Sequence, residues 1–279
     1  MAWYILPYSF LFKIQSFKND PEEIKTNKCD LTNIFVLLRK GMVINMKKIT
    51  TVIFDLDGTL LDTLEDLTDA VNFALTQCGC PERSIDEVRR FVGNGIRKLI
   101  ERAVPGDASE ELTDRVYAYF KEFYDSHCMD KTRVYQGVSE LIGELGKRGC
   151  HMAIVSNKAD HAVKELNRHF FAPEIQVAIG STETGKKKPE PDLVWQALDE
   201  LGSSKEEAVY IGDSDVDLAT AVNAGLPCIS VLWGFRERSF LEQAWDKIQT
   251  DQQKNTSTDL LFAERAEDVL TLLEKYYLN

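Results

Sequence analysis

Cysteines at CxxC spacing are missing from this sequence. The six cysteines, at positions 29, 78, 80, 128, 150 and 228, show no CxxC spacing and no clusters with histidine. Scattered thiols in a chain of this size argue against a disulfide framework, so we expect a reducing, cytoplasmic location. The apolar start, MAWYILPYSFLF, is too short to span a bilayer, and it lacks the positive flank and the cleavage site of a signal peptide.

Positive charge is also scarce. The chain has 33 basic against 45 acidic residues and a formal net charge of -12. Such a field repels nucleic acid and anionic membranes, so neither is an expected partner. An anionic small molecule can still bind where a metal ion, lysines or helix N-termini reverse the local sign. The four histidines have no metal-ligand spacing, and we assign them no role.

The organised part of the chain begins near Met46. The 279 residues are 44% hydrophobic and 28% charged, which is ordinary for a soluble globular protein of one large or two modest domains. Residues 1–45 show no convincing period, whereas MKKITTVIFDLDGT opens directly into a strand pattern. We therefore expect residues 1–45 to be an extension outside the functional protein, with a genuine accessory segment as the alternative.

Beyond Met46, strand-like and helical segments alternate. Alternation at this spacing predicts an α/β fold whose doubly wound parallel sheet is covered by helices on both faces. Ligands of such sheets bind at the carboxyl ends of the strands, where Asp55, Ser156 and Asp213 fall. The expected strands are 49–57, 151–157, 177–180, 208–213 and 228–234, the expected later helices are 138–149, 161–170, 191–202 and 217–225, and the polar stretch 246–258 is expected to be a loop.

A smaller unit interrupts this pattern. Residues 66–133 carry apolar residues at helical spacing and no strand pattern, and Ser84 followed by Glu87 is a capping-box signal. We predict that residues 66–133 form a small all-helical cap, inserted after the first strand. The α/β core would then consist of residues 46–65 and 134–279.

The first strand ends in two carboxylates. Asp55 and Asp57 are two residues apart, so both side chains point to the same side of an extended segment. One carboxylate can attack phosphorus and form an aspartyl-phosphate, while the other exchanges protons with the leaving group and with water. Two carboxylates and a phosphate repel one another unless a divalent metal lies between them, and magnesium prefers oxygen ligands. Further metal ligands and a phosphate cradle are offered by Asp213, Asp217, Lys188 and Ser156.

Four stretches carry a resemblance to a known family. DLDGTLLDT, VSNK, KKPEPD and GDSDVD, in this order, resemble the four motifs of the haloacid dehalogenase superfamily of phosphatases. The helical insertion after the first motif is similar to the first cap class of that superfamily. Within it, FVGNGIRKLI resembles the cap loop of phosphoglycolate phosphatases. The resemblance covers about residues 49–275.

The resemblance implies a catalytic pair, a phosphate cradle and a magnesium site. Asp55 would be the nucleophile, and the side chain of Asp57 would be the general acid and base. The phosphate cradle would consist of Ser156, Asn157 and Lys188. The magnesium ligands would be Asp55, Asp57 through its main-chain carbonyl, Asp213 and, through water, Asp217.

The choice of the phosphate-binding lysine and the role of Arg97 each leave an alternative open. Three lysines run together before Pro189, and Lys188 is favoured over Lys187 because it directly precedes that proline. In the glycine-containing loop FVGNGIRKLI, Arg97 lies in the first turn of a helix, where it could pair with a carboxylate on the substrate. The alternative is that Arg97 is a solvated cap residue and the glycines only shape a turn.

The function implied is a magnesium-dependent phosphatase, a phosphoric monoester hydrolase, that acts on a small phosphorylated metabolite, with phosphoglycolate favoured. A phosphomutase acting on a sugar phosphate, a pyrophosphatase and a catalytically silent binding module are the alternatives. Each motif alone has a plainer interpretation as an acidic turn, a helix cap or a charged loop. Their joint occurrence at successive strand ends favours an active site. We expect a monomer or a homodimer.

Overall fold

The computed structural model describes residues 48–182, 184–251 and 260–276. The expected N-terminal extension, residues 1–45, lies outside the described residues. Among those that are described, no helix is long and apolar enough to cross a membrane. The five cysteines in the described part of the chain are free thiols.

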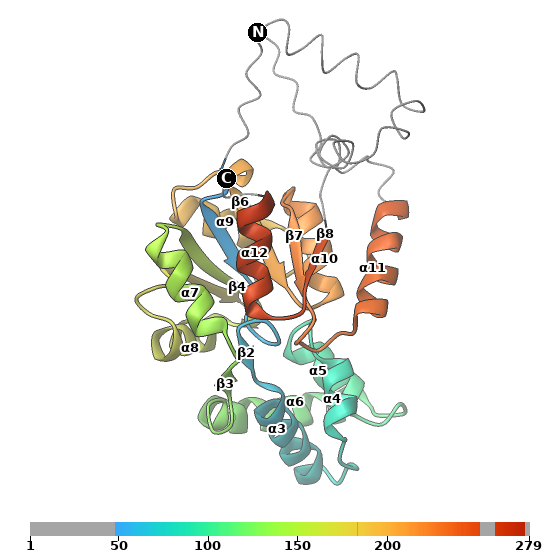
Figure 1. Ribbon diagram of the computed structural model, residues 1–279. Coiled ribbons are helices and arrows are strands. Elements are labelled where there is room, and N and C mark those ends of the chain that lie inside the picture. Colours follow the sequence, from blue (N-terminus) through green and yellow to red (C-terminus); the bar gives the residue numbers. More distant parts are fainter. Residues whose placement is uncertain (1–47, 183, 252–259, 277–279) are drawn as a thin grey trace, which may run out of the picture. The chain divides into compact units, whose positions relative to one another are not determined.

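A six-stranded parallel sheet forms the centre of the fold (Figure 1). Its strand order is β5-β4-β1-β6-β7-β8, so the chain builds outward from β1 in one direction and then in the other. This reversal on either side of β1 makes the sheet doubly wound and confirms the predicted α/β class. The strands are β1 Thr51–Phe54, β4 His151–Ala159, β5 Val177–Ser181, β6 Ala208–Gly212, β7 Cys228–Val231 and β8 Leu260–Ala263.

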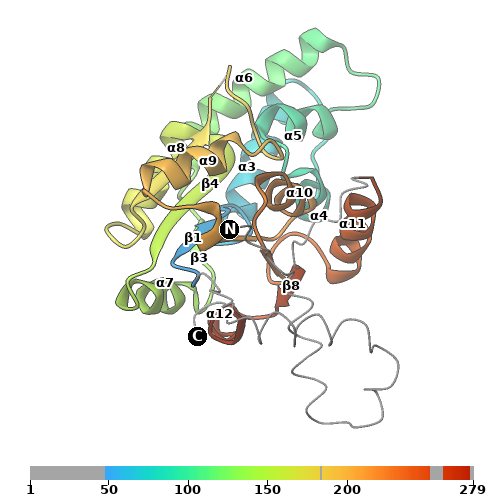
Figure 2. The same ribbon diagram turned by 90° about the horizontal axis from the view of Figure 1, so that it is seen from above.

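Helices cover both faces of this sheet. Ile53, Ala153 and Tyr210 belong to one buried cluster with residues of α9, α10 and α11. On the other face lie α7 and α12, which contact each other (Figure 2). Strands β1, β6 and β7 are buried at every residue, which explains their largely apolar sequences. The helices are α7 Val138–Lys147, α8 Asp160–Phe170, α9 Asp192–Glu200, α10 Asp215–Ala224, α11 Arg238–Asp251 and α12 Ala266–Tyr276.

The C-terminal part corrects one expectation. The predicted loop at 246–258 is wrong for residues 246–251, because α11 continues to Asp251. Leu241, Trp245 and Ile248 recur at helical spacing on α11 and pack against the core cluster, which outweighs the polar character of the sequence. Residues 252–258 lie outside the described residues. The chain then forms β8, a sixth strand that the sequence analysis did not identify.

The helices α3, α4, α5 and α6 lie beyond the carboxyl end of β1 (Figure 1) and are here called the helical layer. They have their own buried cluster, to which α3 contributes six residues and α5 and α6 three each. The predicted capping box of Ser84 and Glu87 is confirmed at the start of α4. The short strands β2 Leu61–Asp62 and β3 Arg133–Val134 pair antiparallel on either side of the insertion, so its two ends lie side by side. The helices are α3 Leu64–Gln77, α4 Ile85–Phe91, α5 Ile96–Ala103 and α6 Glu110–His127.

The packing of the helical layer gives a stability prediction. Phe120 is fully buried in the cluster of this layer. Phe120→Ala should lower the free energy of unfolding by about 3–5 kcal/mol, because the truncation removes apolar contacts and leaves a cavity. Urea denaturation measures this loss. Trp195→Ala is the control, since Trp195 is 50% exposed, and a loss as large as that of Phe120→Ala would contradict the assignment of the core.

Candidate active site

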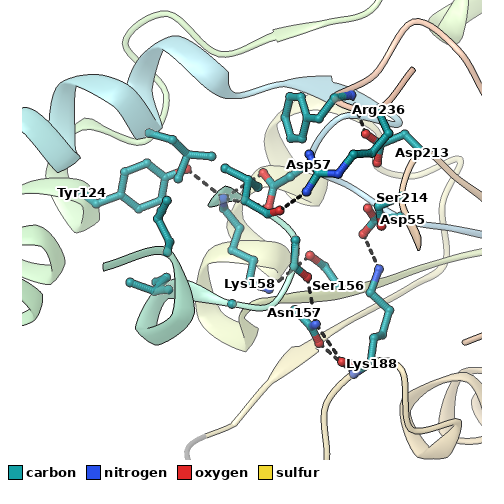
Figure 3. A pocket seen from close by; sticks show the side chains of 17 residues that line it. Asp55, Asp57, Tyr124, Ser156, Asn157, Lys158, Lys188, Asp213, Ser214 and Arg236 are labelled. Atoms are coloured by element: carbon teal, nitrogen blue, oxygen red, sulfur yellow. Dashed lines mark hydrogen bonds and ion pairs between the residues drawn. The ribbon is translucent and has the colours of Figure 1, made fainter. Parts of the chain in front are cut away.

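A small cavity of about 50 Å³ lies between the carboxyl ends of the strands and the helical layer (Figure 3). Asp55 follows β1 directly, Asp213 follows β6 directly, and Ser156 lies in the last half of β4. The fold brings these three groups together because the carboxyl ends of parallel strands meet at one edge of a sheet. The helical layer lines the opposite side with Leu67, Gly93, Gly95, Ile96, Leu99 and Tyr124.

Three buried carboxylates form the acidic part of the site. Asp55, Asp213 and Asp217 each place one carboxylate oxygen within 4.8 Å of the others. Burial, together with the neighbouring Asp217, raises the pKa of Asp55 well above its ordinary value and raises that of Asp213 to about 7. Carboxylate oxygens crowded in this way are the donors that a divalent magnesium ion prefers, so the residues present fit such an ion.

Lys188 is the cation that lies among these carboxylates. Its Nζ donates to Asp55 Oδ1 at 2.6 Å and to Asp217 Oδ1 at 2.8 Å. Burial opposes the charged form, but Asp217 and Asp55 outweigh it and raise the pKa of Lys188 above its ordinary value. Lys187, in contrast, is exposed. The structure therefore brings Lys188, rather than Lys187, to the cavity.

Asn157 fixes the lysine loop to β4. Its Oδ1 accepts from the main-chain N–H of Lys188 at 2.8 Å, and its Nδ2 donates to the Lys188 carbonyl at 3.0 Å. The same Nδ2 lies 3.2 Å from the carbonyl of Gly93 in the helical layer. The side-chain amide thus holds two segments in place beside the cavity. Ser156 lines the cavity, and its Oγ accepts from the N–H of Lys158.

Main-chain N–H groups and a nearby glycine hold Asp217 and Asp213 in place. Asp217 is fixed by the capping box of α10, in which its Oδ2 accepts from the N–H of Ser214 at 3.0 Å. Asp213 Oδ2 accepts from the N–H of Phe235 at 2.6 Å. Gly58 lies so close to Asp213 that a Cβ at this position would be 2.5 Å from Asp213 Oδ2. Only glycine therefore fits at position 58, where the backbone also has φ +88.

Lys158 and Tyr124 were not identified from the sequence. The Nζ of Lys158 lies 2.9 and 3.2 Å from the two carboxylate oxygens of Asp57 and donates to Tyr124 Oη at 2.8 Å. Burial would lower the pKa of Lys158, but Asp57 and Tyr124 raise it above the ordinary lysine value. Lys158 is the last residue of the VSNK stretch, so its place in this motif could have indicated a role in the site. Tyr124 reads as one more residue of the apolar stripe of α6, and only the fold shows that its hydroxyl reaches the cavity.

Arg236 is a further cation that the sequence analysis missed. Its side chain is 11% exposed and lines the cavity. The guanidinium donates to the carbonyl of Arg89 at 2.8 Å and to that of Val92 at 2.6 Å, so it joins the loop after β7 to the end of α4. No local pattern marks this arginine, because its partners are main-chain carbonyls about 145 residues earlier in the chain.

Arg97 has a different environment. It is absent from the residues that line the cavity. Its guanidinium hydrogen-bonds Glu101 at 3.2 Å and also contacts Asp114, and its side chain is 38% exposed. This geometry favours the second interpretation of Arg97, that of a solvated residue of the helical layer. The neighbouring Gly93 and Gly95 do line the cavity.

The fold and the site together define a class, that of an α/β enzyme with a carboxylate-rich active site at the strand ends. Residues 52–231 match the family model of haloacid dehalogenase-like hydrolases, and the chain belongs to this family. Membership confirms the resemblance that the four motifs indicate.

The chain is similar to proteins that are named phosphoglycolate phosphatase. The chain is 35% identical over 206 residues to phosphoglycolate phosphatase 1 of Pseudomonas aeruginosa, a match that covers 69% of this chain and 73% of that protein. It is also 35% identical over 204 residues to a phosphoglycolate phosphatase of Mesorhizobium japonicum, covering 68% of this chain and 86% of the relative. The predicted enzyme class, phosphoric monoester hydrolase, agrees with these names.

A solved structure supports the fold. The candidate phosphoglycolate phosphatase from Lactobacillus delbrueckii subsp. bulgaricus superposes with a TM-score of 0.72 at 29% identity, and the match covers 81% of this chain and 98% of that one. The fold is also shared by a haloacid dehalogenase-like hydrolase from Streptococcus pneumoniae, with a TM-score of 0.67 at 21% identity. The match covers 80% of this chain and 97% of that one.

The close approach of Gly58 to Asp213 gives a prediction for the site. Gly58→Ala should lower the hydrolysis of p-nitrophenyl phosphate by at least about tenfold in the folded enzyme, because the new methyl group displaces the Asp213 carboxylate. Gly79→Ala is the matched control, since Gly79 also has a positive φ of +70 but has no atom within 4 Å of the Cβ that alanine would add. Equal activities of the two folded variants would contradict this account of Gly58.

Proposed function

We propose that this chain is a magnesium-dependent phosphatase that hydrolyses a small phosphorylated metabolite through an aspartyl-phosphate on Asp55. The observation that carries the proposal is the contact of Asp55 with Lys188 in a cavity that also contains Asp57 and Asp213. A carboxylate beside a buried cation is suited to attack an anionic phosphate, because the cation offsets their repulsion.

The reaction has two steps at the same carboxylate. In the first, an oxygen of Asp55 attacks phosphorus, the bond from phosphorus to the ester oxygen breaks, and Asp57 gives a proton to that oxygen. In the second, a water oxygen attacks phosphorus, its proton passes to Asp57, and the bond between phosphorus and Asp55 breaks. Free phosphate leaves and Asp55 returns to its starting form.

The remaining residues would bind the phosphoryl group and the metal ion. Lys188, Ser156 and Asn157 are proposed to contact the phosphoryl oxygens. Magnesium would be held by Asp55, the main-chain carbonyl of Asp57 and Asp213, with Asp217 supporting this shell. When bound, the ion would neutralise negative charge on the phosphate and the carboxylates. The chemistry of the buried carboxylate cluster supports this assignment.

The favoured substrate is phosphoglycolate. The names of the relatives, which are phosphoglycolate phosphatases, support this substrate. The helical layer would act as the cap predicted for residues 66–133, because it lines the side of the cavity that the leaving group would occupy. Lys158 and Arg236 are the cations on that side.

The nucleophile is tested by Asp55→Asn. This change should lower phosphate release by at least about a thousandfold, because an amide is a poor nucleophile and a poor metal ligand. Malachite-green detection of free phosphate measures the loss and also separates a phosphatase from a phosphomutase, which would isomerise a sugar phosphate instead. Asp69→Asn is the control, since Asp69 pairs with Lys131 on the surface. Near-normal turnover by Asp55→Asn would exclude the mechanism.

The metal is tested by its removal. Phosphate release should stop in the presence of a chelator and return on addition of magnesium, because the acidic cavity needs a cation before it accepts a phosphate. Calcium should restore little activity, since its looser coordination misplaces the nucleophile. Circular dichroism in the chelator checks that the fold is intact. Undiminished activity after exhaustive metal removal would refute the requirement.

The surroundings of Arg97 give a third test. Arg97→Ala should change kcat/KM for phosphoglycolate and for p-nitrophenyl phosphate by less than about twofold, because an exposed ion pair contributes little and the guanidinium does not face the cavity. Both substrates are compared under the same conditions. A loss of kcat/KM for phosphoglycolate alone would show instead that Arg97 binds the substrate carboxylate.

A further inference from the structure

Lys158 lies where three elements of the chain meet (Figure 3). It belongs to β4, its partner Asp57 follows β1, and its partner Tyr124 comes from α6 of the helical layer. Its side chain is only 3% exposed, and both lysine and tyrosine line the cavity. The ammonium group spans both oxygens of the Asp57 carboxylate, at 2.9 and 3.2 Å, while Tyr124 Oη lies 2.8 Å away.

This contact restricts Asp57 in a particular way. A carboxylate held through both oxygens by one buried cation cannot rotate freely, because each rotation lengthens one of the two hydrogen bonds. The lysine in turn is held by the tyrosine hydroxyl and by the ring of Tyr124, whose centroid lies 4.8 Å from Nζ. Among the carboxylates of the site in the described residues, Lys158 forms hydrogen bonds and an ion pair with Asp57 and none with Asp55, Asp213 or Asp217.

We propose that Lys158, supported by Tyr124, is the positioning residue for Asp57 in the second step of the reaction. The inference rests on the proposed function, in which Asp57 takes a proton from water as water attacks the phosphorus of the aspartyl-phosphate. The lysine holds the Asp57 carboxylate at the cavity, where that water must lie. The bond between phosphorus and Asp55 breaks in this step, and the water proton goes to Asp57.

The contact also joins this step to the helical layer. Tyr124 is 3% exposed and stacks on Phe120 at a centroid distance of 5.2 Å, inside the buried cluster of the layer. The position of its hydroxyl therefore follows the position of α6. The Tyr124 contact that supports Lys158 is made only when α6 lies on the strand ends, so the second step should be faster in that arrangement.

The test separates the two steps with p-nitrophenyl phosphate, whose leaving group needs no proton. Rapid mixing gives the rate of the first release of nitrophenolate, and the later linear phase gives the rate of the second step. Lys158→Met should leave the first rate nearly unchanged and slow the linear phase by about 100-fold, the usual contribution of a positioned proton-transfer group. The variant should then accumulate phosphorylated enzyme, which acid quenching and mass spectrometry detect as phosphate on Asp55.

Tyr124→Phe keeps the ring and removes only the hydroxyl, so it tests the same point if Lys158→Met does not fold. It should slow the linear phase by about 3- to 10-fold, the loss expected for one hydrogen bond, without slowing the first release. Tyr119→Phe is the matched control, because Tyr119 lies on the same helix and does not line the cavity. It should leave both phases unchanged.

Asp57→Asn is measured in parallel to separate the two possible failures. If Asp57→Asn accumulates phosphorylated enzyme but Lys158→Met and Tyr124→Phe slow both phases equally, the positioning role is overturned and the proposed function stands. If Asp57→Asn also slows both phases equally, the role of Asp57 in the proposed function fails, and the role of Lys158 fails with it.

Discussion

The ion pairs of Lys188 are the interaction on which the site depends. Carboxylates beneath the end of a parallel sheet lose most of their hydration, and burial together with Asp217 raises the pKa of Asp55 and Asp213. A lysine that contacts Asp55 and Asp217 at once offsets part of that cost. Removing one member of such a group would leave an unpaired buried charge, which is far more costly than the loss of an exposed pair.

The surrounding structure holds each member of this group in place. Asn157 binds the main chain of Lys188 on both its N–H and carbonyl sides. The capping box of α10 fixes Asp217, and the N–H of Phe235 fixes Asp213. Each contact uses a main-chain group or a helix end, which has little freedom to move. Secondary structure thus pre-organises the groups that surround the Lys188 side chain.

The helical layer is joined to the strand ends at the cavity itself. Arg236 donates to the carbonyl of Val92, Asn157 reaches the carbonyl of Gly93, and Lys158 reaches the hydroxyl of Tyr124. All three donors come from the α/β core, and all three acceptors come from the helical layer. A displacement of the layer would therefore break polar contacts that lie within the cavity, and it would change the surroundings of Asp57 as well as the volume available to a substrate.

The sequence by itself determined the α/β class, five of the six strands and the groups at their ends, because apolar runs, caps and short motifs are local patterns. It also predicted helices over residues 66–133, and α4, α5, α6 and most of α3 lie in that stretch. Only the tertiary structure showed that Lys188, and not Lys187, reaches Asp55, that Arg97 lies outside the cavity, and that α11 extends to Asp251. Only the fold showed that Tyr124 and Arg236 line the cavity. Their partners are far away in the chain, and a contact between distant residues cannot be predicted from the local spacing of residues around either one.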